Sequence, residues 1–295
     1  IQTSSWFSTI GVIVGTIFPG VLIIFLGVYW IAGGNPSQTP MTLHALMPDF
    51  SSPSNLVFLT GLFLAFAGLE VSAAHANNVQ NPQKNYPRSI ILAAIITFFI
   101  FMLGALSIAI VIPKAQISLV GGLMDAFKVF LSTYRLDWFL PLLGVLLVIG
   151  AVAEVNAWII GPVKGLYATS IHGNLPPVFQ HLNRYGMPTN LLLFQGIIVT
   201  GMTFVIFYTP SIDSFYWMLS ALSAQSYLMM YILMFVAAIR LRYVHPHVPR
   251  AYRVPYQTKG IWFVGSIGIL ASLFAIGIAF LPPSQMMVHN ESFTQ

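Results

Sequence analysis

Long apolar runs separated by short polar stretches dominate the sequence. A helix of about 20 apolar residues crosses the hydrocarbon core of a bilayer. Runs of this kind predict seven membrane-spanning helices, at residues 8–32, 56–76, 89–112, 138–168, 190–208, 214–239 and 261–281. The connecting stretches are rich in Pro, Gly and Asn and leave no room for a soluble domain. The pattern therefore predicts an all-α membrane protein with a single transmembrane domain over residues 1–295.

One further segment, residues 114–136, has a different pattern. Its apolar side chains recur on one helical face, at Val120, Leu123, Met124, Phe127, Phe130 and Leu131. The charged residues of this segment are Lys114, Asp125, Lys128 and Arg135, and the pattern is typical of a helix that is half in contact with an apolar phase. The segment is predicted to be an amphipathic helix that lies near the membrane surface.

Composition supports the membrane assignment and excludes several other classes. Hydrophobic residues make up 57% of the chain and charged residues only 6%, against about 25% charged in soluble domains. The net charge of +5 is scattered over the loops instead of forming one basic stripe, so it does not indicate nucleic-acid binding. The absence of cysteine excludes disulfides, thiolate metal sites and cysteine nucleophiles.

The basic residues predict the orientation of the chain. If the loops alternate between the two sides, nine of the twelve Lys and Arg residues lie on one side. These nine are Lys84, Arg88, Lys164, Arg184, Arg240, Arg242, Arg250, Arg253 and Lys259. The other side holds Lys114, Lys128 and Arg135. The positive-inside rule places the larger set in the cytoplasm, so the span at 8–32 runs outward.

The second predicted span contains the first candidate functional residues. Gly68 and the acid Glu70 interrupt its apolar run. An acid inside a membrane helix costs about 2.5 to 3.5 kcal/mol on insertion scales, and such residues usually face protein or water and carry a function. Glycine weakens a helix, and many transporters bind substrate at a discontinuous helix. The alternative is a small-residue packing face with a hydrogen-bonded Glu.

Two other predicted spans carry polar groups. Glu154 and Trp158 are four residues apart and share a face of the fourth span, which makes a cavity-lining helix plausible. An acid that is satisfied by neighbouring helices is the alternative there. In the sixth span a hydroxyl stripe fits either a polar path or helix–helix hydrogen bonds. It consists of Ser220, Ser223, Tyr227 and Tyr231.

Catalytic and cofactor signals are weak. The sequence has no HExxH motif, no Gly-x-Ser-x-Gly elbow and no P-loop, so we expect no enzyme and no cofactor. His245 and His247 lie in a basic loop and are weak candidates for metal binding. A seven-helix receptor or retinal protein is a further alternative, but a retinal site needs a lysine in mid-membrane, and Lys164 lies near a helix end. A membrane enzyme that acts through Glu154 is another alternative.

Three stretches resemble a known family. They are FAGLEVSAAHANNVQNPQKNYPRSI, AEVNAWIIGPVKGLYATSIHGNLPP and, less specifically, YRVPY. With them the chain resembles the amino acid/polyamine/organocation (APC) superfamily, and within it the glutamate/GABA antiporters of bacterial acid resistance. The resemblance implies a LeuT-like inverted-repeat fold of twelve helices, of which this chain would supply the fifth to the eleventh. The first four helices of the transporter, missing here, would then be its partners, and the twelfth would be missing too.

The resemblance also implies roles for individual residues. Phe66, Gly68 and Glu70 match the broken sixth helix, which meets or gates the substrate. Glu154 and Trp158 match an acid and an aromatic residue beside the pathway, and Tyr227 and Tyr231 match two tyrosines of the tenth helix. The family's C-terminal plug has no counterpart, so His172, His181, His245 and His247 are only candidate titrating groups on the cytoplasmic side.

The prediction from the sequence is thus a multi-pass antiporter of the cytoplasmic (inner) membrane. We expect it to exchange external glutamate for internal GABA by alternating access, in acid resistance. An antiporter for another amino acid or amine, such as arginine/agmatine, is the nearest alternative. The expected partners are the amino acid substrate and the lipid bilayer.

Overall fold

Helices account for all the regular secondary structure in the part of the chain that the computed structural model describes. That part consists of residues 2–40, 42, 47, 56, 58–71, 79–113, 116–118, 121–209, 212–248 and 254–280. The elements before the midpoint are α1 (Gln2–Val12), the π-helix η1 (Ile13–Ile17), α2 (Phe18–Ala32), α5 (Phe58–Phe66), α6 (Pro82–Val111), α7 (Gly122–Thr133) and η4 (Asp137–Phe139). They are followed by α8 (Leu140–Ile171), η5 (Pro177–Gln180), α9 (Thr189–Thr203), η6 (Phe204–Tyr208), α10 (Ile212–Val244) and α11 (Gln257–Ala279). The all-α prediction is confirmed.

Within the described residues, six stretches of helix are long and apolar enough to cross a membrane. They cover Trp6–Ala32, Lys84–Val111, Asp137–Ile171, Thr189–Tyr208, Ser214–Val244 and Gln257–Ala279. The second predicted span corresponds to a shorter apolar segment, Leu59–Val71, whose α-helix ends at Phe66. The predicted count of seven is therefore not confirmed. Residues 57 and 72–76 of that predicted span lie outside the described residues, as do Lys114, Arg250, Arg253 and residue 281.

The chain forms two compact units. The first contains residues 1–41, 71–77 and 92–209, and the second contains residues 42–70, 78–91 and 210–295. One boundary between the units falls directly after Glu70, and another falls inside α6. The site residues predicted from the sequence are thereby divided, because α8 belongs to the first unit and α10 to the second.

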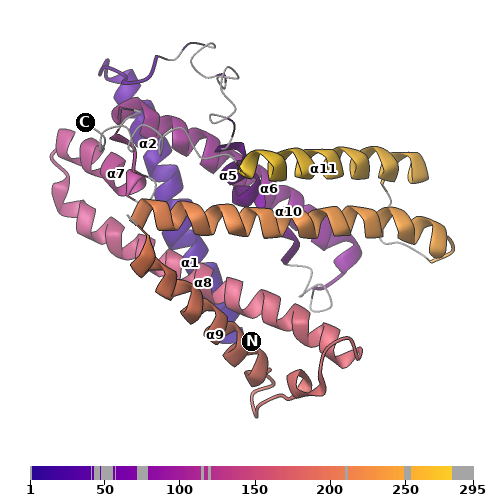
Figure 1. The fold of residues 1–295 in the computed structure, drawn as a ribbon. Helices are drawn as coiled ribbons and strands as arrows, with labels where there is room; N and C mark the ends of the chain where they lie inside the picture. Colours follow the sequence, from indigo (N-terminus) through magenta and orange to yellow (C-terminus); the bar gives the residue numbers. More distant parts are fainter. Residues whose placement is uncertain are drawn as a thin grey trace. The chain divides into compact units, whose positions relative to one another are not determined.

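A close helix crossing organises the first unit. The helices α1, η1 and α2 follow one another without interruption, and α1 and η1 pack against α8 (Figure 1). A Cβ on Gly11 would meet the Cβ of Ala153 at 2.1 Å, and a Cβ on Gly15 would meet the backbone of Gly150 at 2.2 Å. Small residues let helix backbones approach closely, which is how helices associate in lipid. The crossing therefore depends on these glycines.

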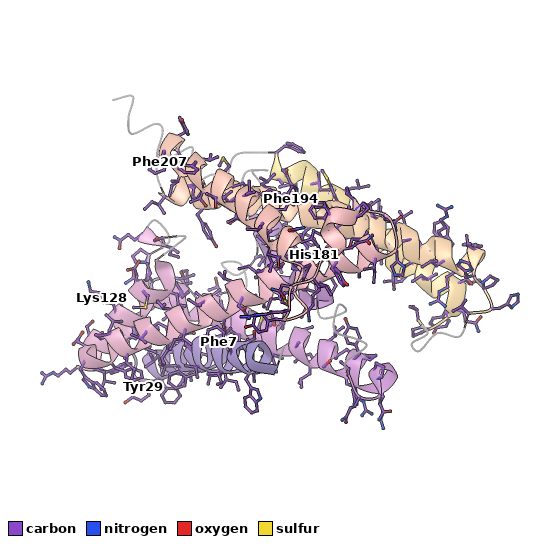
Figure 2. The ribbon with its side chains drawn as sticks, turned by 90° about the horizontal axis from the view of Figure 1, so that it is seen from below. Phe7, Tyr29, Lys128, His181, Phe194 and Phe207 are labelled. Atoms are coloured by element: carbon purple, nitrogen blue, oxygen red, sulfur yellow. The ribbon has the colours of Figure 1, made fainter. Side chains whose placement is uncertain are left out.

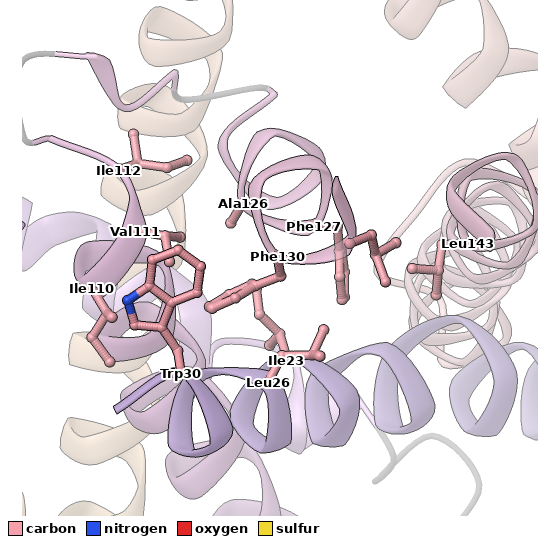
Figure 3. Close-up of a cluster of buried hydrophobic side chains, with 11 residues drawn as sticks. Ile23, Leu26, Trp30, Ile110, Val111, Ile112, Ala126, Phe127, Phe130 and Leu143 are labelled. Carbon is pink, nitrogen blue, oxygen red and sulfur yellow. The ribbon is translucent and has the colours of Figure 1, made fainter. Parts of the chain in front are cut away.

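The largest apolar core of the first unit lies between α2, the end of α6 and α7. Trp30 packs edge-on against Phe130, with ring centroids 5.6 Å apart (Figure 3). The other core residues are Ile23, Leu26, Ile110, Val111, Ile112, Ala126, Phe127, Leu131 and Leu143. The apolar face of α7 is thus buried against other helices. That this segment also lies at the membrane surface stays a prediction.

Apolar side chains also cover much of the outside of the first unit. Tyr29 is 54% exposed and Phe207 is 78% exposed, and Figure 2 shows them on α2 and at the end of η6. Phe7 and Phe194 are exposed as well. Apolar exposure on this scale would be unfavourable in water. It indicates that these helices contact lipid.

The second unit is built on the helix pair α10 and α11, which run side by side in Figure 1. Glycines of α11 receive large side chains of α10: a Cβ on Gly268 would meet the ring of Phe235 at 2.3 Å. At Gly265 it would meet the Cδ1 atom of Ile239 at 2.8 Å. The helix α5 packs on both α10 and α11. This packing brings the end of α5 beside the middle of α10.

Candidate functional site

The candidate site begins where α5 breaks. The helix ends at Phe66, a turn follows at Ala67 and Gly68, and a short 3-10 turn covers Leu69–Val71. Gly68 has a φ of +101°, a conformation that side chains with a Cβ avoid. Glycine is therefore required at this position for the chain to leave the helix as it does.

The carboxylate of Glu70 turns back onto this break. The Gly68 N–H donates to both of its oxygens, Oε1 and Oε2, each at 3.2 Å. A break in an apolar helix leaves backbone groups without their helical partners, and leaving such a group unpaired is costly. Glu70 thus accepts a hydrogen bond from the backbone at the point where the helix no longer provides an acceptor.

The second donor to Glu70 comes from α10. The Tyr231 hydroxyl donates to Oε2 at 2.9 Å. Tyr227 lies one helical turn earlier on the same face, with its ring centroid 5.9 Å from that of Tyr231 and an interplanar angle of 60°. All three side chains are half-buried. The acid therefore lies between a backbone amide and a pair of tyrosines.

The structure thus brings four of the predicted site residues together in the second unit. Gly68, Glu70, Tyr227 and Tyr231 form this cluster, which we call the Glu70 cluster. Phe66 is the last residue of α5, two positions before Gly68, and is half-buried. A clustered acid and aromatic hydroxyls can accept a hydrogen bond from a cationic ligand group and donate one to an anionic group.

The other two predicted site residues, Glu154 and Trp158, lie on α8 in the first unit. Glu154 is exposed and Trp158 is half-buried. The neighbouring residue Ala153 is buried against Gly11, so α8 turns one face to α1 and leaves Glu154 outside that contact. An exposed acid in the middle of a membrane-spanning helix requires water or a polar partner.

Asn156 was not predicted from the sequence as a residue of the site. Its side-chain amide Nδ2 donates to the Ser8 hydroxyl at 3.4 Å, linking α8 to α1. The signal in the sequence that could have identified Asn156 is its amide side chain, which lies in the same apolar run as Glu154. The hydrogen bond fixes the rotation of α8 beside the glycine crossing, which determines where Glu154 and Trp158 point.

Metal-centred chemistry finds no support in the described residues. No group of three or more His, Cys, Asp or Glu side chains among them is arranged to hold a metal ion. The described histidines His245 and His247 lie at the end of α10 and in the turn after it. The Glu70 cluster has no metal-ligand pattern either, since it contains a single acid and no histidine.

Comparison with known proteins decides the family. The model of a family described as amino acid permease matches residues 1–295, which is the whole chain. The chain belongs to the amino acid permease family. The predicted resemblance is thereby confirmed, and the chain is a multi-pass membrane protein of this family. Its fold is consistent with the APC fold.

Three relatives show what this permease is similar to. It is 40% identical over 98% of its length to an uncharacterised transporter of Legionella pneumophila. It is 33% identical over 96% of its length to a glutamate/gamma-aminobutyrate antiporter of Lactococcus lactis. A probable agmatine/putrescine antiporter of the same species is 30% identical over 80% of the chain. The chain spans 62%, 57% and 48% of the lengths of these three relatives.

Proposed function

We propose that this permease is an antiporter that exchanges external glutamate for internal GABA by alternating access in the inner membrane, as part of acid resistance. The Lactococcus relatives named as glutamate/gamma-aminobutyrate antiporters, which are 33% identical over 96% of the chain, support this substrate pair. The apolar helices and exposed apolar side chains support a membrane location. The predicted role of helices upstream of residue 1 as partners stays a prediction.

One observation carries the proposal, the position of Glu70 between the helix break and Tyr231. An acid that merely filled space in an apolar span would be costly to keep. Here its carboxylate is held by the Gly68 amide and the Tyr231 hydroxyl. Both substrates contain a carboxylate and an ammonium group. The first can take the donors from Glu70, and the second can pair with the acid itself.

The remaining predicted residues have supporting roles in this proposal. Glu154 supplies negative potential along the path, and its protonation, like that of Glu70, shifts which substrate charge state is accepted. Tyr227 and Tyr231 close over the aliphatic part of the substrate. Phe66 gates the break from the end of α5. The exposure of Glu154 on a membrane-spanning helix supports its proposed role along the path.

Exchange assays test the substrate pair. Liposomes containing the full-length protein are loaded with GABA, and labelled glutamate is added outside. We expect uptake that depends on internal GABA and does not occur in empty liposomes. Uptake that proceeds equally without an internal substrate would contradict exchange.

The site is tested separately with side-chain variants. Glu70→Gln keeps the shape of the side chain but removes its charge, and Tyr231→Phe removes one donor. We expect either change to lower exchange about tenfold, since a hydrogen bond to a charged group contributes about 1.5 to 3 kcal/mol. Glu70→Gln and Glu154→Gln should also change the pH profile. Tyr216→Phe, at an exposed tyrosine of the same helix, is the control. Wild-type rates and profiles would remove these residues from the mechanism.

A second candidate function is exchange of amines. The relative named as a probable agmatine/putrescine antiporter supports it, because it is 30% identical over 80% of the chain. An acid in the candidate site would also suit a dication. Liposomes loaded with agmatine, putrescine or arginine discriminate the two functions. Exchange supported by these compounds, and not by GABA, would replace the glutamate/GABA assignment with the amine assignment.

A further inference from the structure

A second feature of the permease lies at the far end of the α10–α11 pair. There the Trp262 indole N–H donates to the Tyr243 hydroxyl at 2.8 Å, across the two helices. Tyr243 is 60% exposed and Trp262 is 48% exposed. Tyrosine and tryptophan gather at the boundary between hydrocarbon and headgroups, where an apolar ring and a polar tip are both accommodated. The pair therefore marks the level of the lipid headgroups.

Cations flank this aromatic pair on both helices. Arg240 precedes Tyr243 by three residues on α10, and Lys259 precedes Trp262 by three residues on α11. Residues three apart lie on the same face of a helix. Arg240 and Lys259 are both exposed. One continuous surface thus contains Arg240, Tyr243, Lys259 and Trp262, and we call it the basic aromatic end.

The charge at this end has no acidic counterpart nearby in the sequence. From Arg240 to Lys259 the chain contains four arginines, one lysine and two histidines, and no acid. The nearest acids along the chain are Asp213 and Glu291. A positive surface attracts anions, and at a membrane the abundant anions are the headgroups of acidic phospholipids.

The packing of the two helices makes the surface rigid. Gly265 and Gly268 receive Ile239 and Phe235, and a Cβ on Gly260 would meet the Pro255 carbonyl oxygen at 1.8 Å. The start of α11 is therefore fixed against the turn that precedes it. Because the two backbones are fixed against each other, little backbone entropy is lost when a headgroup binds.

We propose that the basic aromatic end binds the phosphate of an anionic phospholipid in the cytoplasmic leaflet. Arg240 and Lys259 contact the phosphate, while Tyr243 and Trp262 pack beside the glycerol and the upper acyl chain. The positive-inside prediction places this end in the cytoplasmic leaflet. The ligand is the lipid and not a soluble anion, because the aromatic rings are positioned for an apolar portion.

Tryptophan fluorescence tests the proposal on the full-length protein. The protein is reconstituted in phosphatidylcholine vesicles that contain brominated phosphatidylglycerol or, at equal mole fraction, brominated phosphatidylcholine. The emission of Trp262 is the difference between the wild type and Trp262→Phe. We expect phosphatidylglycerol to quench it more strongly. This preference should fall about fivefold for each cation removed, since a basic residue at the surface contributes about 1 kcal/mol.

Two double variants, each of which removes two positive charges, provide the test and its matched control. Arg240→Gln with Lys259→Gln should abolish the preference, whereas Lys128→Gln with Arg135→Gln, two basic residues of the first unit, should keep it. Equal quenching of the wild type by both brominated lipids would overturn the proposal without any variant. An equal loss in both double variants would show a general charge effect and would also overturn it. Reversal of the preference by inorganic phosphate would identify a soluble-anion site instead.

Discussion

At the scale of residues, Glu70 shows how an acid is accommodated in an apolar helix. Its carboxylate accepts the Gly68 N–H and the Tyr231 hydroxyl. Gly68 and Glu70 were both identified from the sequence, because each of them is unfavourable in a continuous apolar helix. The donor Tyr231 was predicted as part of a hydroxyl stripe and by the resemblance, but its hydrogen bond to Glu70 was not predicted. It is 161 residues away along the chain, and no local pattern encodes that contact.

Gly68→Ala tests whether the break depends on the backbone conformation. A residue with a Cβ is strained at a φ of +101°, so we expect a loss of about 1 to 3 kcal/mol in stability. Gly61→Ala is a matched control in the same helix, where a Cβ would meet nothing within 4 Å. There alanine should be neutral or stabilise by up to about 1 kcal/mol. Thermal unfolding in detergent measures both, and equal effects would contradict the requirement for glycine.

At the scale of elements, the length and periodicity of the apolar runs predicted helices throughout, because only helices satisfy the backbone of a single apolar run in lipid. The π-helix Ile13–Ile17 was not predicted. It lies next to Pro19, whose missing N–H disturbs the helical hydrogen bonds. It also carries Gly15 against Gly150. Such a contact depends on the partner helix, so the sequence of one span does not reveal it.

Gly150→Val tests the helix crossing. A Cβ at this position would meet the Cα of Gly15 at 2.7 Å, and a backbone atom does not move aside cheaply. We expect the variant to lose about 1 to 3 kcal/mol of stability. Gly144→Ala on the same helix is the control, since its Cβ would meet only the flexible end of Met124, at 3.8 Å. Thermal unfolding measures the stability of both variants, and equal stability would contradict the close helix crossing.

At the scale of the whole molecule, the break explains why the sequence suggested seven spans while six long apolar helices are observed. The run at 56–76 is apolar over most of its length, and its hydrophobicity does not reveal that α5 ends at Phe66. Family membership was recognisable because the motifs around Glu70 and Glu154 are local in sequence. The division of these acids between two compact units is a property of the packing.

The orientation of the permease can be tested because the chain lacks cysteine. Single cysteines are introduced at Lys128 and Lys259 of a full-length protein from which any cysteine outside this chain has been removed, and intact cells are treated with a membrane-impermeant maleimide. We expect Lys128→Cys to react from outside, and Lys259→Cys to react only after the cells are permeabilised. Labelling of both positions in intact cells would contradict the predicted alternation of the loops.

The helix break has a consequence for how the protein is made. The nine residues of α5 extend about 14 Å at 1.5 Å per residue, about half of a hydrocarbon core near 30 Å. During synthesis, α5 and Glu70 leave the ribosome long before Tyr231 exists. The break must therefore remain in contact with water, protein or the insertion machinery until α10 arrives. Assembly of the Glu70 cluster is thus a late event in the biogenesis of this permease.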